Sequence, residues 1–187
     1  MSVTTPQILT MKLSRREVEH CVPGGIWCLD KYVPWWRSEL RRRGVDRLLL
    51  VLTARNCPGC DELKHQLVRH GAGLTRALIV QAECGDLHGP SYFAIQWGKV
   101  VLRFPGVPTT LLIDVNDPEV LTLLALSLGP LTRGQEEEEL SGLLQGKSRW
   151  IREAAGVPLR LVEPGAERIL QLAEFDALKI PLAELSP

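Results

Sequence analysis

The sequence predicts an α/β protein whose mixed sheet is flanked by helices. The stretch "RLLLVLTA", residues 47–54, is a continuous apolar run of strand length, as expected of a central strand covered on both faces. The stretch "CPGCDELKHQLVRHGAG" that follows has the pattern of a helix, and "RALIVQAEC", residues 76–84, has that of a second strand. Because strand, helix and strand follow one another, the two strands should be parallel and joined by a crossover.

The predicted helix of this crossover has clear start and end signals. Pro58 fits the first helical position, Asp61 suits the positive end of the helix dipole, and Gly71 provides an end signal. Cys57 therefore precedes the helix directly, and Cys60 lies in its first turn.

The other half of the sheet is predicted from the segments after residue 105. The stretch "VPTTLLIDV", residues 107–115, is a strand that begins with a proline, and "VNDPE" is a turn that joins it to "VLTLLALSLG". Two strands joined by so short a turn should pair antiparallel. A final helix is expected at about residues 135–155, with the acidic run "EEEE" at its N-terminal end, and residues 85–105 are expected to form helix or loop.

The remaining segments are predicted to form extensions of this α/β region. One helix is expected from about Ser14, and a second, short helix from Pro34 to an end signal at Gly44. We therefore expect three parts, which are a helical N-terminal extension over residues 1–44, an α/β domain over residues 45–156, and a C-terminal extension of short pieces over residues 157–187.

Composition and charge exclude several classes of protein. Of the 187 residues, 45% are hydrophobic and 24% are charged, and 22 Lys and Arg residues balance 22 Asp and Glu residues, as in ordinary globular proteins. No large basic field is present, so no nucleic-acid partner is expected. The longest apolar runs are shorter than the roughly 20 residues of a membrane helix, so no membrane association is expected. The N-terminus lacks the apolar region of a secretory signal, and a cytoplasmic location is therefore expected.

The cysteine pair at positions 57 and 60 has the spacing of a redox centre. A cysteine at a helix N-terminus lies among unpaired backbone N–H groups and the positive end of the dipole. This environment can lower its pKa from about 8.5 to roughly 3.5–7.5. Cys60, one helical turn after Cys57, is near enough to attack a mixed disulfide formed at Cys57. In a reducing compartment such a pair is more often catalytic or metal-binding than structural.

A metal site is the first alternative for this pair. It needs two further ligands, for which His20, Cys21 and Cys28 are available, but C-x6-C beside C-x2-C is not a familiar zinc spacing. Redox exchange between thiols is the favoured function, and it requires no metal and no other cofactor.

The second alternative is a redox-inactive interaction module that keeps Cys57 and Cys60 as a static disulfide or as inert thiols. In that case the Trp-rich N-terminal region would hold a partner, and its tryptophans together with Trp97 could line a hydrophobic binding surface, because tryptophan is enriched at binding hot spots. Packing onto the sheet is the favoured role for these side chains, and for Cys84 we expect a core thiol. The tryptophans concerned are Trp27, Trp35, Trp36 and Trp97.

Two motifs resemble those of the thioredoxin-like superfamily. They are Cys57-Pro58-Gly59-Cys60 and, further along the chain, Gly106-Val107-Pro108-Thr109. They occur in the order strand, CxxC, helix, strand, "GVPTTLLID", antiparallel strand and closing helix, and the resemblance covers roughly residues 45–156. In that family the proline of the second motif is cis and lies against the CxxC, and the preceding residue offers its backbone to an extended substrate segment.

The resemblance implies a thiol–disulfide oxidoreductase. By it, Cys57 is the attacking thiolate, Cys60 is the resolving thiol, Pro108 is the cis-proline, and Val107 is the backbone contact for substrate. The implied partners are protein disulfides or dithiols, together with an unidentified thiol reductase or oxidant.

The sequence departs from the family pattern at the residues around the motif. Asn56 stands where a tryptophan is common, and Val51 stands where the family has a buried acid that assists proton transfer. The inner dipeptide Pro-Gly resembles a glutaredoxin site in its first half. However, the double glycine that glutaredoxins use for glutathione is absent from "LLIDVNDPEVL", so glutathione is not expected to be the obligatory partner.

Overall fold

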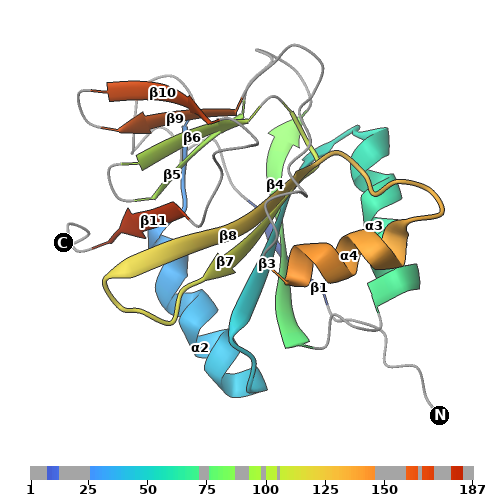
Figure 1. The fold of residues 1–187 in the computed structure, drawn as a ribbon, viewed down its shortest axis with the longest axis horizontal. Helices are drawn as coiled ribbons and strands as arrows, with labels where there is room; N and C mark the ends of the chain where they lie inside the picture. The colour runs from blue at the N-terminus through green and yellow to red at the C-terminus, as the bar shows by residue number, and fades with distance from the viewer. Residues whose placement is uncertain are drawn as a thin grey trace.

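A computed structural model describes residues 8–12, 26–71, 76–86, 93–97, 100–104, 106–145, 159–163, 166–170 and 178–182 of the chain. Its elements in chain order are β1 (Ile8–Lys12), β2 (Ile26–Cys28), the 3-10 helix η1 (Asp30–Tyr32), α2 (Val33–Arg43), β3 (Arg47–Arg55), α3 (Pro58–His70), β4 (Ala77–Asp86), β5 (Phe93–Trp97), β6 (Val100–Phe104), β7 (Thr109–Asp114), β8 (Val120–Leu128), α4 (Glu136–Leu144), β9 (Leu159–Glu163), β10 (Ala166–Leu170) and β11 (Leu178–Pro181) (Figure 1). Within these described segments, no helix is both long and apolar enough to cross a membrane.

The central sheet has six strands in the order β1-β4-β3-β7-β8-β11. Strands β1, β4 and β3 are parallel to one another, which confirms the predicted crossover from β3 through α3 to β4. Strand β7 runs antiparallel to β3, and β8 runs antiparallel to β7, which confirms the predicted pair on either side of the "VNDPE" turn.

Strand β3 is buried on both faces, as its unbroken apolar run predicts. Leu48, Leu50 and Leu52 belong to the core on the face of α2, and Leu49 and Val51 belong to the core on the face of α3 and α4. The sheet is therefore the middle layer of the fold, with α3 and α4 on one side (Figure 1). Helix α2 and a second sheet pack on the other side.

The second sheet has five strands in the order β10-β9-β6-β5-β2. It corrects the expectation of helix or loop for residues 85–105, because strand β4 extends to Asp86 and β5 and β6 form an antiparallel pair. Ile95 and Trp97 of β5 and Leu102 of β6 are fully buried in the core that α2 also lines. The strand pattern here is short, and distant partners, β2 and β9, complete the pairing.

The N-terminal region is not purely helical, which corrects the expected helical extension. Strand β1 joins the edge of the central sheet beside β4, and β2 joins the second sheet. Helix α2 is confirmed, with Pro34 in its first turn and Gly44 in the left-handed conformation at its end (φ 66°). The helix expected from Ser14 falls on residues 13–25, outside the described residues.

The C-terminal region also contributes a strand, since β11 pairs antiparallel with β8 at the other edge of the central sheet. Helix α4 begins at the acidic run as expected but ends at Leu144, with Gln145 as its C-cap, so it is shorter than the predicted helix; residues 146–155 lie outside the described residues. The domain boundaries at Val45 and Gly156 stay predictions. Strand β1 comes from the predicted N-terminal extension and β11 from the predicted C-terminal extension, and both belong to the central sheet.

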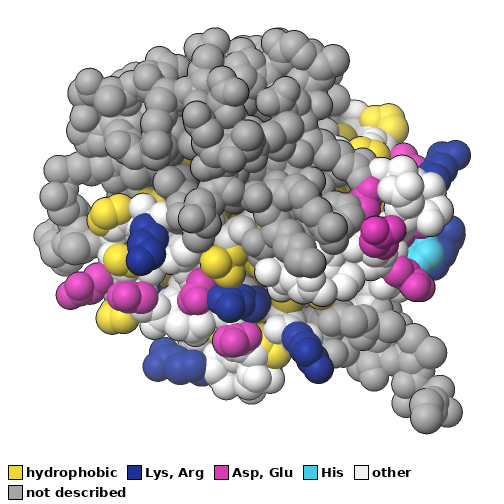
Figure 2. All heavy atoms as spheres, in the orientation of Figure 1, with side chains coloured by type: hydrophobic (Ala, Val, Ile, Leu, Met, Phe, Trp, Pro, Cys, Tyr) yellow, Lys and Arg dark blue, Asp and Glu magenta, His cyan; other side chains and the backbone are white. Residues whose placement is uncertain are grey.

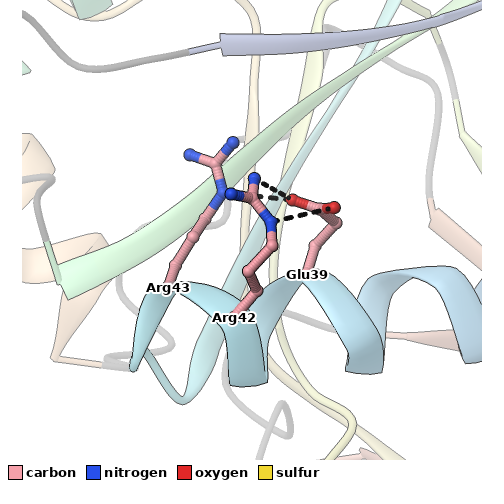
Figure 3. Close-up of polar contacts among 3 residues, drawn as sticks. All are labelled: Glu39, Arg42 and Arg43. Atoms are coloured by element: carbon pink, nitrogen blue, oxygen red, sulfur yellow. Dashed lines mark hydrogen bonds and ion pairs between the residues drawn. The ribbon is translucent and has the colours of Figure 1, made fainter.

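A three-residue charge cluster lies on the last turns of α2. The Glu39 carboxylate accepts hydrogen bonds from Nη2 of Arg42 at 2.8 Å and from Nε of Arg43 at 3.3 Å (Figure 3). The hydrogen bond from Arg42, followed by that from Arg43, lowers the pKa of the Glu39 carboxyl. Because the pKa of Glu39 is lower in the folded state, its hydrogen bonds with the two arginines stabilise the fold at pH values above its unfolded pKa. This stabilisation is lost as the pH falls through the folded pKa.

Charges of both signs are interspersed on the face seen in Figure 2. Among the described residues on that face, basic and acidic side chains alternate over the lower part of the molecule and around the helices at the right, without a large field of one sign. This distribution agrees with the equal numbers of basic and acidic residues in the sequence.

Trp36 is the central side chain of the packing between α2 and the second sheet. It is fully buried, stacks on Tyr32 and meets Trp97 edge to face with ring centroids 6.4 Å apart. We expect Trp36→Ala to lower the free energy of unfolding by about 3–5 kcal/mol, measured by chemical denaturation, because it leaves a large cavity. The matched control is the neighbouring Trp35, which is 38% exposed; Trp35→Ala should cost about 1 kcal/mol or less. Equal losses in the two variants would contradict this account of the core.

Candidate functional site

The two cysteines predicted to react are joined by a disulfide where the central strand ends and α3 begins. The Cα atoms of Cys57 and Cys60 are 5.2 Å apart. Between β3 and the helix, Asn56 adopts a positive φ of 56°, a conformation that asparagine tolerates better than most residues. Cys57 is the N-cap of α3 and Pro58 is its first residue, as the sequence predicts.

The Cys57 sulfur takes the place of the usual capping oxygen of α3. The Cys60 N–H donates to Cys57 Sγ at 3.2 Å and also lies 3.1 Å from the Cys57 carbonyl oxygen, which the Asp61 N–H reaches at 3.2 Å. In the reduced protein the same N–H group and the positive end of the helix dipole would face the Cys57 sulfur. Both favour its thiolate form.

The second motif lies directly beside the disulfide. The Val107–Pro108 peptide bond is cis, and the Val107 carbonyl oxygen is 3.8 Å from Cys57 Sγ. The Thr109 hydroxyl donates to the Gly106 carbonyl oxygen at 2.7 Å, and the Gly129 N–H donates to the Pro108 carbonyl oxygen at 2.8 Å. The fold therefore brings the two predicted motifs together, although they are far apart in the sequence.

Gly59 lies against this loop without a side chain between them. A Cβ atom at this position would lie 3.4 Å from Cδ of Pro108 and 3.7 Å from Cδ of Pro130. The first turn of α3 can thus approach the cis-proline closely because its second residue is glycine.

Both cysteines are largely covered by protein. Cys57 and Cys60 are each 5% exposed, and they form a small cluster with Ala54 against which Val107 packs. Pro58 and Asn56, on either side of Cys57, are exposed. A reacting partner must therefore come close to the backbone around Cys57 to reach its sulfur.

A cavity of about 440 Å³ lies on the Cys60 side of the disulfide. It is lined by the end of β3, the first turns of α3 and the facing part of β4, and its polar lining includes Thr53, Gln81 and Glu83. Gln81 Nε2 donates to the Thr53 hydroxyl at 3.0 Å, and Glu83 Oε1 lies 3.7 Å from Nε of Arg55. The sequence analysis missed these residues. The signal in the sequence was "QAE" in β4: Gln81 and Glu83 are two residues apart, so both lie on the face of the strand that α3 covers.

Gln66 is a second residue that the sequence analysis missed. This buried side chain of α3 donates from Nε2 to the Leu131 carbonyl oxygen at 2.9 Å and accepts from the Leu131 N–H at 2.8 Å. It thereby holds the segment that contains Gly129 and Pro130, whose contacts with Pro108 and the Gly59 position are described above.

The other candidates from the sequence have different outcomes. No group of three or more His, Cys, Asp and Glu side chains suited to a metal occurs among the residues that the structure describes. His20, Cys21 and the side chain of Cys28 lie outside those residues, as does the side chain of Cys84. The expected packing role is observed for Trp36 and Trp97, which are fully buried, whereas Trp35 is 38% exposed and the Trp27 side chain is not among those described.

The reciprocal hydrogen bonds of Gln66 should contribute measurably to stability. Gln66→Leu removes both partners of Leu131 and leaves a buried N–H and a buried carbonyl unpaired. We expect the free energy of unfolding to fall by about 1–3 kcal/mol in urea denaturation. His65→Leu, at the adjacent exposed position of the same helix, is the matched control and should change it by about 0.5 kcal/mol or less. The account of Gln66 is wrong if the control loses as much.

Comparison with known proteins finds similarity at the level of structure only. No protein-family model matches the sequence, and no curated protein matches it. Among solved structures, the chain is similar to the short form of thioredoxin f from spinach chloroplast, with 11% sequence identity and a TM-score of 0.38 over 66% of this chain and 94% of that chain. The parallel and antiparallel strand order, the Cys57–Cys60 disulfide at the start of α3 and the cis-proline beside it show that the protein has a thioredoxin-like fold.

Proposed function

We propose that the protein is a thiol–disulfide oxidoreductase that exchanges the Cys57–Cys60 dithiol or disulfide with protein substrates. The observation that carries this proposal is the disulfide at the N-terminus of α3, with a backbone N–H directed at the Cys57 sulfur. The helix dipole and this N–H stabilise negative charge on Cys57 Sγ, and the thiolate is the nucleophile in exchange.

In the reductive direction the reaction has two exchange steps. The Cys57 thiolate attacks one sulfur of a substrate disulfide, forms a mixed disulfide and releases the other substrate sulfur as a thiolate. The Cys60 thiolate then attacks Cys57 Sγ, which forms the intramolecular disulfide and releases the second substrate sulfur. The substrate gains two electrons, the pair loses two, and a separate thiol reductase restores the dithiol; an oxidant would drive the reverse direction.

Val107 and Pro108 are proposed as the contact for the substrate segment. The Val107 carbonyl oxygen lies 3.8 Å from the Cys57 sulfur, which supports this role because a chain that meets the Val107 backbone would be beside the reacting atom. Backbone pairing of this kind accepts an extended peptide with little dependence on its side chains. It suits protein substrates better than small thiols.

A redox-inactive interaction module receives less support. It relied on a Trp-rich surface, but Trp36 and Trp97 are fully buried and pack against one another, which leaves Trp35 as the exposed tryptophan among the described side chains. The proposed exchange needs no cofactor, and the cytoplasmic location stays a prediction.

Insulin reduction with dithiothreitol as the electron source tests the proposal. The wild-type protein should accelerate insulin precipitation, and Cys57→Ser should reduce the rate to that of dithiothreitol alone, because serine cannot form the mixed disulfide. Cys84→Ser removes a thiol outside the pair and serves as the matched control that keeps the activity. A wild-type protein no faster than the Cys57→Ser variant would refute the enzymatic function.

The order of the two cysteines can be tested by trapping. Cys60→Ser retains the attacking thiolate but cannot resolve the intermediate, so we expect a covalent complex with a disulfide substrate that dithiothreitol releases. Non-reducing electrophoresis and mass spectrometry detect the complex. With Cys57→Ser no such complex should accumulate, and the reverse result would exchange the roles of the two residues.

A further inference from the structure

We propose that Glu83 accepts the proton of the Cys60 thiol, through the solvent of the cavity beside it, when Cys60 resolves the mixed disulfide. This inference rests on the proposed function and adds a residue to its mechanism. It starts from the burial of Cys60, which is 5% exposed. Burial disfavours the thiolate, yet the thiolate is the form that must attack Cys57 Sγ.

Cys60 lacks the help that the helix gives to Cys57. The Cys60 N–H, in the first turn of α3, donates to Cys57 Sγ at 3.2 Å. The Cys60 sulfur lies further along the helix, where the following N–H groups are used within the helix. The helix therefore stabilises a Cys60 thiolate less than a Cys57 thiolate, and a nearby base that accepts the Cys60 proton would aid the attack.

The face of the sheet under α3 changes from apolar to polar as it approaches Cys60. Three cross-strand pairs of β3 and β4 follow one another on this face, and they are Leu49 with Ile79, Val51 with Gln81, and Thr53 with Glu83. Leu49, Ile79 and Val51 belong to the buried core. Gln81 and the pair of Thr53 and Glu83 line the cavity next to Cys60. The cavity of about 440 Å³ has room for several water molecules in contact with polar groups.

Four charged side chains line this cavity together with Cys60, and they differ in what they can do. Arg55 of β3 and Lys64 of α3 are cations and cannot accept a proton. Asp61 directly follows Cys60 on the helix, so it is rotated by about 100° around the axis and is exposed to solvent. Glu83 projects from β4, and its side chain is only 19% exposed. Glu83 is therefore the less exposed of the two carboxylates that line this cavity with Cys60, and the one we assign to exchange a proton with it through water.

The positive groups fit this role as well. Lys64 lies four residues after Cys60 and thus on the same side of α3, where its charge favours a thiolate. Arg55 Nε is 3.7 Å from Glu83 Oε1 and keeps the carboxylate at the cavity wall.

In the proposed step the Cys60 S–H bond breaks and its proton passes through water to the Glu83 carboxylate. The Cys60 thiolate then displaces the substrate sulfur from Cys57, and the departing thiolate takes up a proton from solvent or from Glu83.

Stopped-flow reaction of the reduced protein with the chromogenic disulfide dithiobis-nitrobenzoate separates the two exchange steps. The first release of nitrothiobenzoate reports attack by Cys57, and the second reports attack by Cys60 on the mixed disulfide. Phases that persist in Cys57→Ser belong to other thiols, and the phase missing from Cys60→Ser is the resolving step. The pH is varied from about 5 to about 9, across the range in which thiols titrate.

We expect Glu83→Gln to slow the second phase by about tenfold to a hundredfold near neutral pH and to leave the first phase unchanged. The wild-type second phase should be nearly independent of pH there, whereas that of the variant should rise about tenfold per pH unit, because hydroxide must remove the proton. If Glu83 acted only as a negative charge, its removal would favour the thiolate and would speed the second phase. The sign of the change therefore distinguishes the two roles.

Three matched variants complete the test. Arg55→Gln breaks the ion pair but keeps the carboxylate, and it should slow the second phase much less than Glu83→Gln. Asp61→Asn should also have little effect. Glu138→Gln, on the exposed face of α4, is the control for an equal change of charge.

The inference is overturned by an unchanged or faster second phase in Glu83→Gln, by equal slowing in Arg55→Gln, or by slowing in Asp61→Asn instead. Equal slowing of both phases in Glu83→Gln would indicate a structural effect and would also overturn it. If the wild-type protein shows neither phase, the proposed function itself fails, and the inference fails with it. If the wild-type protein shows both phases and Glu83→Gln changes neither of them, the inference is overturned but the proposed function stands.

Discussion

The burial of strand β3 on both faces is the constraint that places every part of the candidate site. Its apolar side chains are shared between two cores, one with α2 and the second sheet and one with α3 and α4. A strand held in this way cannot shift its register without exposing a whole row of side chains. Its carboxyl end, its parallel neighbour β4 and its antiparallel neighbour β7 are therefore fixed relative to one another. These three strands position Cys57, the lining of the cavity and the cis-proline loop.

The same constraint explains why the chemistry is confined to the end of the sheet. Val51 keeps the face under α3 apolar at the position where the sequence resemblance would put an acid, and the polar pair of Thr53 and Glu83 comes one step later. The polar lining of the cavity thus begins beside Cys60 at the rim of the core, and the centre of the sheet is apolar. Gln66 closes the arrangement from the other side, because it fixes the segment that packs behind Gly59 and the cis-proline.

The elements that the sequence predicted well are those whose pattern is local and strong. The apolar run of β3, the proline and acidic start of α3, the turn between β7 and β8 and the acidic start of α4 each contain their own signal. The strands β1, β5 and β6 do not, since their pairing depends on partners far along the chain, and weak local propensity left residues 85–105 ambiguous. Within the site, the CxxC and the proline motif were visible, and the structure places them in contact. Glu83 and Gln66 were not, because their roles depend on register between strands and on a loop from a distant segment.

The central claim is that Cys57 and Cys60 form a reversible redox pair and not a structural disulfide. Equilibration of the protein with dithiothreitol or glutathione buffers of graded potential, with quantification of the Cys57–Cys60 disulfide by mass spectrometry, tests this claim most directly. The account predicts a single two-electron transition with a midpoint within the range of about −270 to −120 mV that thiol–disulfide exchange proteins span. A disulfide that stays oxidised below about −300 mV, as structural disulfides do, would contradict it, and so would a dithiol that never closes.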